Sequence, residues 1–370
     1  MSRRRRRPAR GKPRGKLRGG FRLAFVLLLL VAGIAAGWLW QRYTAFADQP
    51  VSGIEAGETL VVERGDSLPR VVARLREAGV QEGHRLEWQL LARQLGAAGR
   101  IQVGEYALEP GITPRQLLEQ LRDGDVIGHR FTIVEGWNIR ELRAALAKAT
   151  PLGHEVTGLD DAALMEALGH AGQHPEGRFL PETYVYTRGD SDLDILRRAH
   201  AGMQQALQKA WDARDPDTVL KTPEEMLVLA SIVEKETGIA EERPRIAGLF
   251  LRRLELGMRL ETDPTVIYGM GSAYAGNIRK RDLQTDTPYN TYVRAGLPPT
   301  PIAMPGVAAL EAVANPAPGK ALFFVAVGDG SGRHLFADTY AEHQANVRRY
   351  LGNYRQARQA REAAAETEAQ

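Results

Sequence analysis

The stretch that most clearly encodes a fold reads Leu60-Val61-Val62-Glu63-Arg64-Gly65-Asp66-Ser67-Leu68. Its three apolar residues favour a short strand, and Gly65 then permits a tight turn. Ser67, two positions later, can accept hydrogen bonds from the free N–H groups of a first helical turn. The apolar spacing that follows predicts an amphipathic helix through Leu75.

The same pattern of strand, glycine, capping residue and helix occurs twice more. The cap always lies two positions after the glycine, and a leucine lies ten positions after it. The further copies are Tyr106–Leu108, Gly111, Thr113 and Leu121, and Phe131–Val134, Gly136, Asn138 and Leu146. Because the copies are unequally spaced, they do not form a solenoid. They predict small α+β modules over residues 59–148.

The rest of the chain also mixes helix and strand patterns. We expect a larger α+β domain over residues 149–352, with a hairpin formed by Leu322–Val327 and His334–Ala337. Residues 353–370 form a charged tail that we expect to be frayed. The quartet Gly65-Asp66-Ser67-Leu68 resembles LysM glycan-binding modules, but a simple strand-to-helix connection explains it equally well.

The N-terminus has the pattern of a membrane anchor. Leu23–Trp40 is an unbroken apolar run, and residues 1–20 carry many Arg and Lys and no acidic residue. The positive-inside rule therefore predicts a cytoplasmic tail (1–20), one transmembrane helix (21–40), a linker (41–58) and an exported remainder. We expect a single-pass protein of the cytoplasmic (inner) membrane.

A cleaved signal peptide is the alternative, since Ala45-Phe46-Ala47 resembles a cleavage site. The apolar run is longer than a usual signal core, which favours the anchor. The basic residues that give the chain its net charge of +4 lie in the tail, so we expect no nucleic-acid partner. The chain has no cysteine, which excludes disulfides, thiolate metal sites and a cysteine nucleophile.

One helix carries the candidate catalytic residue. Thr222 and Pro223 predict its start and Gly238 its end. Helical spacing places Glu236 on the apolar face and Glu234 toward solvent. Burial and the negative end of the helix dipole should both raise the pKa of Glu236, as a general acid requires. The alternative is a partly exposed glutamate neutralised by a neighbouring cation.

Sequence blocks in and after this helix resemble a known family. They are Ala230–Thr237 (with the motif Glu234-Lys235-Glu236-Thr237), Gly257–Gly269, Tyr289-Asn290-Thr291-Tyr292 and Gly296-Leu297-Pro298-Pro299. In this order they closely resemble the endolytic murein transglycosylase family (MltG, also called YceG-like), from the anchor to about Leu351. In that family the second glutamate of the motif is catalytic, which implies Glu236 here.

The resemblance implies a lytic transglycosylase that cleaves the bond between N-acetylmuramic acid and N-acetylglucosamine in peptidoglycan strands. The muramic acid 6-hydroxyl attacks, so a 1,6-anhydro end forms with a single Glu as acid/base and without metal or cofactor. Its role would be to trim or terminate nascent strands, beside cell-wall synthases. Tyr289, Asn290, Tyr292 and Asp263 are the candidate substrate-binding residues, because aromatic rings pack on sugars and amides bond hydroxyls. A turn with core tyrosines is the alternative for the Tyr289–Tyr292 segment.

Two other functions remain open at this point. The chain could be a non-catalytic peptidoglycan-binding tether, or a glycoside hydrolase that pairs Glu236 with Asp263 or Glu182. His170 and His174 are four residues apart, but the intervening Gly172 and the lack of a carboxylate ligand disfavour a metal site. The reaction products would separate the three functions.

Overall fold

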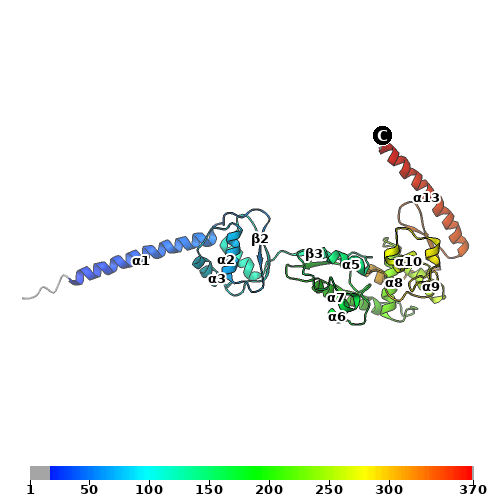
Figure 1. The fold of residues 1–370 in the computed structure, drawn as a ribbon, viewed down its shortest axis with the longest axis horizontal. Helices are drawn as coiled ribbons and strands as arrows, with labels where there is room; N and C mark the ends of the chain where they lie inside the picture. The colour runs from blue at the N-terminus through cyan, green and yellow to red at the C-terminus, as the bar shows by residue number, and fades with distance from the viewer. Residues whose placement is uncertain (1–16, 369–370) are drawn as a thin grey trace, which may run out of the picture. The chain divides into compact units, whose positions relative to one another are not determined.

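The computed structural model describes residues 17–368 and is a mixed helix-and-sheet structure (Figure 1). The chain divides between Ile127 and Gly128 into two compact units, which we describe separately as unit 1 and unit 2. The basic tail predicted for residues 1–20 lies almost wholly outside the described residues.

Unit 1 begins with helix α1, Leu17–Asp48. Phe21 to Trp40 are exposed, and the helix is long and apolar enough to cross a membrane. The first part of the predicted linker (residues 41–58) is helical, because α1 continues into it as far as Asp48. Ala47 and Val51 are buried in the core of unit 1, and the Val51 N–H donates to the Ile112 carbonyl at 2.9 Å.

The body of unit 1 is a two-stranded sheet with three helices. Strands β1 and β2 pair antiparallel with Leu60 opposite Tyr106, and Trp88 and Leu117 lie with them in the core. The elements are β1 (Glu58–Val62), α2 (Leu68–Glu77), α3 (Arg85–Gln94), β2 (Gly104–Leu108) and α4 (Pro114–Asp123).

All three predicted strand–glycine–cap–helix copies form. The glycines Gly65, Gly111 and Gly136 have φ of 88°, 91° and 76°, the left-handed region that glycine adopts without strain. Thr113 and Asn138 accept hydrogen bonds from the first helical turn, whereas Ser67 occupies the cap position without a side-chain bond. The third copy lies in unit 2, where its strand pairs with a strand about fifty residues later.

Unit 2 opens with a second antiparallel pair, in which Phe131 of β3 lies opposite Tyr184 of β4. Ser191 caps the long helix α7. The elements of this part are β3 (His129–Thr132), α5 (Ile139–Leu146), α6 (Asp161–Ala167), β4 (Thr183–Tyr186) and α7 (Asp192–Asp212).

The centre of unit 2 is helix α8, Pro223–Glu236, whose residues Met226–Val233 are all buried among α7, α9 and α12. The helices that follow it are α9 (Arg243–Glu255), α10 (Asp263–Met270), the 3-10 turn η1 (Gly271–Ala273), α11 (Lys280–Gln284) and α12 (Val307–Ala314).

The C-terminal part of unit 2 contains the predicted hairpin, β5 (Phe323–Ala326) and β6 (His334–Ala337). Helix α13 then runs from Tyr340 to Glu368 and so includes most of the predicted tail, residues 353–370. The tail therefore differs from the frayed segment we expected, because its Ala, Glu and Arg residues are strong helix formers.

Candidate active site

Glu236 is the last residue of α8, where the chain leaves the core. Thr237 ends the helix in an extended conformation (φ −148°), so Gly238 does not provide the predicted left-handed stop. The helix is buried on all sides from Met226 to Val233. The single apolar face inferred from the sequence is therefore wrong, and the position of Glu236 at the helix end is what brings its carboxyl to a cavity.

The carboxyl of Glu236 has one hydrogen-bond donor, the hydroxyl of Thr262, which binds Oε1. Burial raises the pKa of Glu236 to about 7, and the nearby negative charge of Asp263 adds to this rise, while the Thr262 hydrogen bond opposes it. The carboxyl is therefore substantially protonated near neutral pH, as expected for a general acid.

Thr262 is itself held by two other threonines. Its N–H donates to Thr291 Oγ1 at 3.1 Å, and its carbonyl accepts from Thr265 Oγ1 at 2.8 Å. The hydroxyls of Thr265 and Thr291 are 2.9 Å apart, and all three residues are almost fully buried. This threonine cluster (Thr262, Thr265, Thr291) fixes the backbone of Thr262, so that its hydroxyl is aimed at Glu236.

The residue before the cluster is in a strained conformation. Glu261 has φ +51° and, among residues 17–368, is the one non-glycine residue with positive φ. Such a conformation costs about 1–3 kcal/mol and persists only where neighbouring groups hold it. Here the Glu261 N–H donates to the Thr291 carbonyl at 3.2 Å, and Arg253 Nη1 binds its carboxylate at 3.2 Å. This turn therefore sets the direction of Thr262.

Glu236 lines a cavity of about 370 Å³ in unit 2. Tyr292 and Asp263 also line it, and the Tyr292 hydroxyl donates to Asp263 Oδ1 at 2.6 Å. Two further rings, Phe323 and Tyr340, come from the hairpin and the start of α13. The remaining lining residues are Arg253, Leu260, Glu261, Thr262, Phe324, Val325 and His343. The sequence reasoning missed this aromatic wall, although the pair Phe323-Phe324 in the predicted hairpin was a visible signal.

Tyr289 and Asn290 do not line this cavity. Asn290 is fully buried, and its Nδ2 donates to the carbonyls of Asp282, Leu283 and Thr285, while its Oδ1 accepts from the Tyr292 N–H. The Tyr289 ring packs edge-on against Tyr268, and its hydroxyl bonds Thr300 at 2.9 Å. In this structure both residues shape the loop that carries Tyr292.

The solvent exposure predicted for Glu234 is wrong. Its side chain is only 6% exposed and accepts a hydrogen bond from the Gly306 N–H at 3.0 Å, with Arg243 Nη2 at 3.8 Å. Burial raises the pKa of Glu234 as well. The reason is tertiary: α9 and the segment before α12 cover this side of α8, which the spacing within one helix cannot reveal.

The other candidates from the sequence lie elsewhere. Glu182 is exposed beside β4 and does not line the cavity, so Asp263 is the nearer second carboxylate for a hydrolase. His170 stacks on His200 with ring centroids 3.9 Å apart, whereas His174 Nδ1 accepts the Glu176 N–H. Arg253, which lines the cavity, donates to the carbonyls of Leu322, Arg259 and Leu260 and so holds these segments together.

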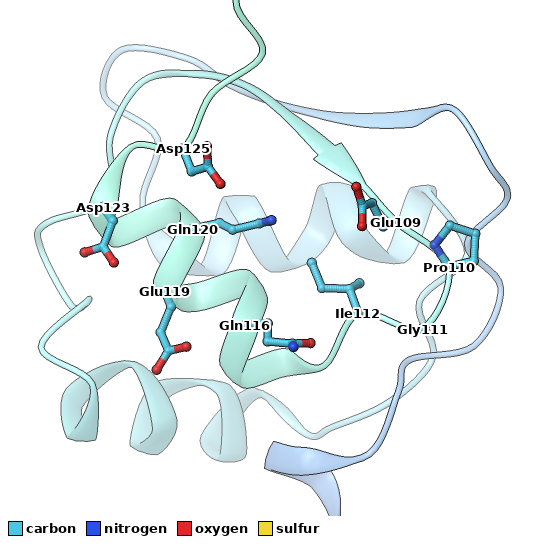
Figure 2. A pocket seen from close by; sticks show the side chains of 9 residues that line it. All are labelled: Glu109, Pro110, Gly111, Ile112, Gln116, Glu119, Gln120, Asp123 and Asp125. Atoms are coloured by element: carbon cyan, nitrogen blue, oxygen red, sulfur yellow. The ribbon is translucent and has the colours of Figure 1, made fainter.

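A second cavity, of about 500 Å³, lies beside α4 in unit 1 (Figure 2). Its charged side chains are the acids Glu109, Glu119, Asp123 and Asp125, and Gln120 extends into the space between Asp125 and Glu109. The acids are spread around α4 and do not converge on one point. We therefore assign no chemistry to this cavity.

The fold and site together define a mixed helix-and-sheet protein in which a half-buried glutamate, Glu236, lines an aromatic-walled cavity. A family model described as the YceG-like family matches residues 60–349, so the chain belongs to that family.

Two curated relatives are named endolytic murein transglycosylase. The Bacillus subtilis (strain 168) protein is 27% identical over 310 residues, which cover 79% of this chain and 84% of that protein. The Streptococcus pneumoniae (strain D39) protein is 25% identical over 364 residues, covering 88% of this chain and 64% of that longer protein. A crystal structure of a YceG-like protein from Listeria monocytogenes, 25% identical, covers 78% of this chain and 98% of its own with a TM-score of 0.49.

Proposed function

We propose that this protein is a lytic transglycosylase that cleaves peptidoglycan glycan strands internally, with Glu236 as its single acid/base. The relatives named endolytic murein transglycosylase support the reaction and the substrate. The observation that carries the assignment of the residue is the raised pKa of Glu236, about 7, in a cavity walled by aromatic rings. A carboxylic acid that is protonated near neutral pH can donate to a glycosidic oxygen.

The proton transfer follows from the geometry of the carboxyl. Because Thr262 donates to Oε1, the proton of the acid lies on Oε2. Glu236 gives this proton to the oxygen that leaves with the N-acetylglucosamine side as the glycosidic bond breaks. The 6-hydroxyl of the N-acetylmuramic acid then attacks its own anomeric carbon and returns a proton to Glu236. The products are one free hydroxyl and one 1,6-anhydro end, and the enzyme is restored.

Asp263 and Tyr292 are the best placed of the predicted substrate-binding residues. Both line the cavity with Glu236, so the carboxylate can accept from a sugar hydroxyl and the ring can pack on a sugar face. Asp263 also leaves one rival reaction to be tested. A hydrolase that used it as a second carboxylate would produce reducing ends instead of anhydro ends.

We also propose that α1 anchors the chain in the cytoplasmic membrane with its N-terminus inside and both units exported. The basic residues before the apolar run support this orientation. A reporter fused after Leu351 should be active only outside the cytoplasm. Unit 1 remains a candidate glycan-binding module of LysM type, and the strand–helix–helix–strand order of β1, α2, α3 and β2 supports that proposal.

The test is digestion of purified glycan strands by E236Q, with E234Q as the matched control on the same helix. E236Q keeps the shape of the side chain but cannot donate and recover a carboxyl proton, so anhydro ends detected by mass spectrometry should fall by about 10²–10⁴-fold. E234Q keeps an acceptor for the Gly306 N–H and should retain activity within a few fold. Equal activity of E236Q and wild type would refute the assignment, and reducing ends would favour the hydrolase. Binding of strands by wild type without any product would favour the tether.

A further inference from the structure

Helix α3 of unit 1 is apolar on two opposite sides. Trp88, Leu91 and Ala92 are buried in the core of the unit. Leu86 and Leu90, four residues apart and therefore on one helix face, are 67% and 54% exposed. We call these two residues the leucine stripe. Burying each of these two leucine side chains would stabilise the protein by about 1.5–3 kcal/mol, so their exposure on one face of a short helix suggests that they contact something else.

The stripe is rigidly connected to α1. Arg42 forms an ion pair with Glu87 at 3.0 Å, and the Tyr43 hydroxyl bonds Gln94. Phe46 packs edge-on against Trp88 with ring centroids 5.2 Å apart. These contacts all lie within the last two turns of a helix that is continuous from Leu17 to Asp48. The position of α3 along α1 is therefore fixed.

That position coincides with the end of the apolar run. Arg42 and Tyr43 follow Trp40 by two and three residues, which is about 3–5 Å along the helix axis. Glu87 and Gln94 are seven residues apart on α3, about 10 Å, yet they contact adjacent residues of α1. Helix α3 therefore runs across α1, and it lies along the membrane plane when α1 crosses the bilayer.

The orientation of α3 about its own axis is also fixed. Its core side contacts Phe46, which lies one turn farther from the apolar run than Arg42. The core side of α3 therefore faces away from the membrane. Leu86 and Leu90 lie roughly opposite Trp88 on the helix, so the stripe faces back toward the membrane. Arg85 and Arg93 at the two ends of the helix are exposed.

We propose that α3 is a second membrane contact, which rests its leucine stripe in the outer surface of the bilayer. The leucines enter the boundary between headgroups and acyl chains, and Arg85 and Arg93 bind lipid phosphates, as in interfacial amphipathic helices. This inference depends on the proposed anchoring by α1. It gives unit 1 a defined orientation on the membrane, instead of a free tether.

The absence of cysteine from the chain makes a direct test available. Single variants L86C and L90C of the full chain are labelled with an environment-sensitive fluorophore. They are then placed one copy per nanodisc, in phosphatidylethanolamine and phosphatidylglycerol with spin-labelled quencher lipids. L29C in the apolar run is the membrane reference. V103C, on an exposed site of unit 1, is the aqueous reference. We expect L29C to be quenched most, L86C and L90C at least twofold more than V103C, and V103C scarcely at all.

The outcomes separate this proposal from the anchoring proposal. If L29C is quenched while L86C and L90C behave like V103C, α3 does not contact lipid and the inference is overturned with the anchor intact. If L29C is not quenched, the anchor itself fails. The fluorophores at Leu86 and Leu90 could instead report an apolar environment only in vesicles that hold many copies of the chain. That result would show a contact between chains and would also overturn the lipid contact.

Discussion

Thr262 donates its hydroxyl hydrogen to Oε1 of Glu236, which leaves Oε2 as the oxygen that carries the proton when this carboxyl is protonated. Thr262 can do this because both its N–H and its carbonyl are bound by Thr291 and Thr265. The strained residue Glu261 stands immediately before it. The geometry of the proposed acid/base therefore depends on a short turn from the Gly257–Gly269 block as well as on the helix that carries Glu236.

The first prediction concerns the hydrogen bond from Thr262 to Glu236. T262V keeps the shape of the side chain but removes the donor that favours the ionised carboxyl, so the pKa of Glu236 should rise further. The decline of kcat on the alkaline side should move to higher pH, and kcat itself should fall by roughly tenfold because the carboxyl is no longer oriented. Measuring anhydro product from pH 5 to 9 tests both effects. T262S, which keeps the hydroxyl, should restore both, and an unchanged alkaline limb in T262V would contradict the positioning role.

The sequence predicted local structure well and tertiary surroundings poorly. The turns at Gly65, Gly111 and Gly136 were predictable because each depends on a glycine and a cap within a few residues. The pairing of β3 with β4 and the burial of Glu234 were not, because both depend on partners about 50 to 70 residues away. The buried amide of Asn290 is a third case, since its partners become visible only once the loop is folded.

The same division holds for the candidate site. Glu236 could be singled out because the motif resemblance pointed to it, whereas the helical-face argument pointed to the same residue for a reason that the structure does not support. Thr262 lies within a block quoted for the resemblance, but its hydroxyl could not be assigned to Glu236 from spacing alone. The rings of Phe323 and Tyr340 also line the cavity, although they lie about 90 and 100 residues after Glu236 in the sequence.

The second prediction concerns Asp263, whose substitution should change the pKa of Glu236 in the opposite direction to T262V. The negative charge of Asp263 raises the pKa of Glu236, so D263N should lower that pKa and move the alkaline decline of kcat to lower pH. The Tyr292 hydroxyl can still donate to the amide oxygen of the new residue. Y292F is the matched control, since it removes the hydroxyl and leaves the Asp263 charge in place. An alkaline decline that stayed at the same pH in D263N would mean that burial, and not the Asp263 charge, sets the pKa of Glu236.

The third prediction separates loop structure from sugar binding at Asn290. N290A removes the donors to three carbonyls and the acceptor for the Tyr292 N–H, which leaves buried polar groups unsatisfied. It should lower the stability of the protein by about 2–4 kcal/mol, measured by urea denaturation. Y289F removes one hydroxyl bond, to Thr300, and should cost about 1 kcal/mol. A fully stable N290A that lost only substrate affinity would instead support direct contact with the glycan.

The last prediction concerns Glu176, a carboxyl outside the cavity. It is fully buried and accepts the Ile139 N–H, with Tyr268 of α10 as a further donor. Burial raises the pKa of Glu176 to about 7 in the folded protein, above its ordinary value of 4.5. Between these two values the folded chain holds a proton that the unfolded chain has released, so stability falls as pH rises through this window and levels off above it.

E176Q should remove this dependence, because the amide stays neutral and keeps an acceptor for Ile139. Wild type and E176Q should have similar unfolding free energies near pH 5. At pH 8.5 E176Q should be the more stable, by at most about 3 kcal/mol. Glu236 titrates in the same window, but it is present in both proteins, so the difference between their urea-denaturation curves isolates Glu176. E176A should be less stable at every pH, since the Ile139 N–H loses its acceptor. Parallel curves for wild type and E176Q would mean that Glu176 is ionised throughout, held by the nearby positive charge of Arg140.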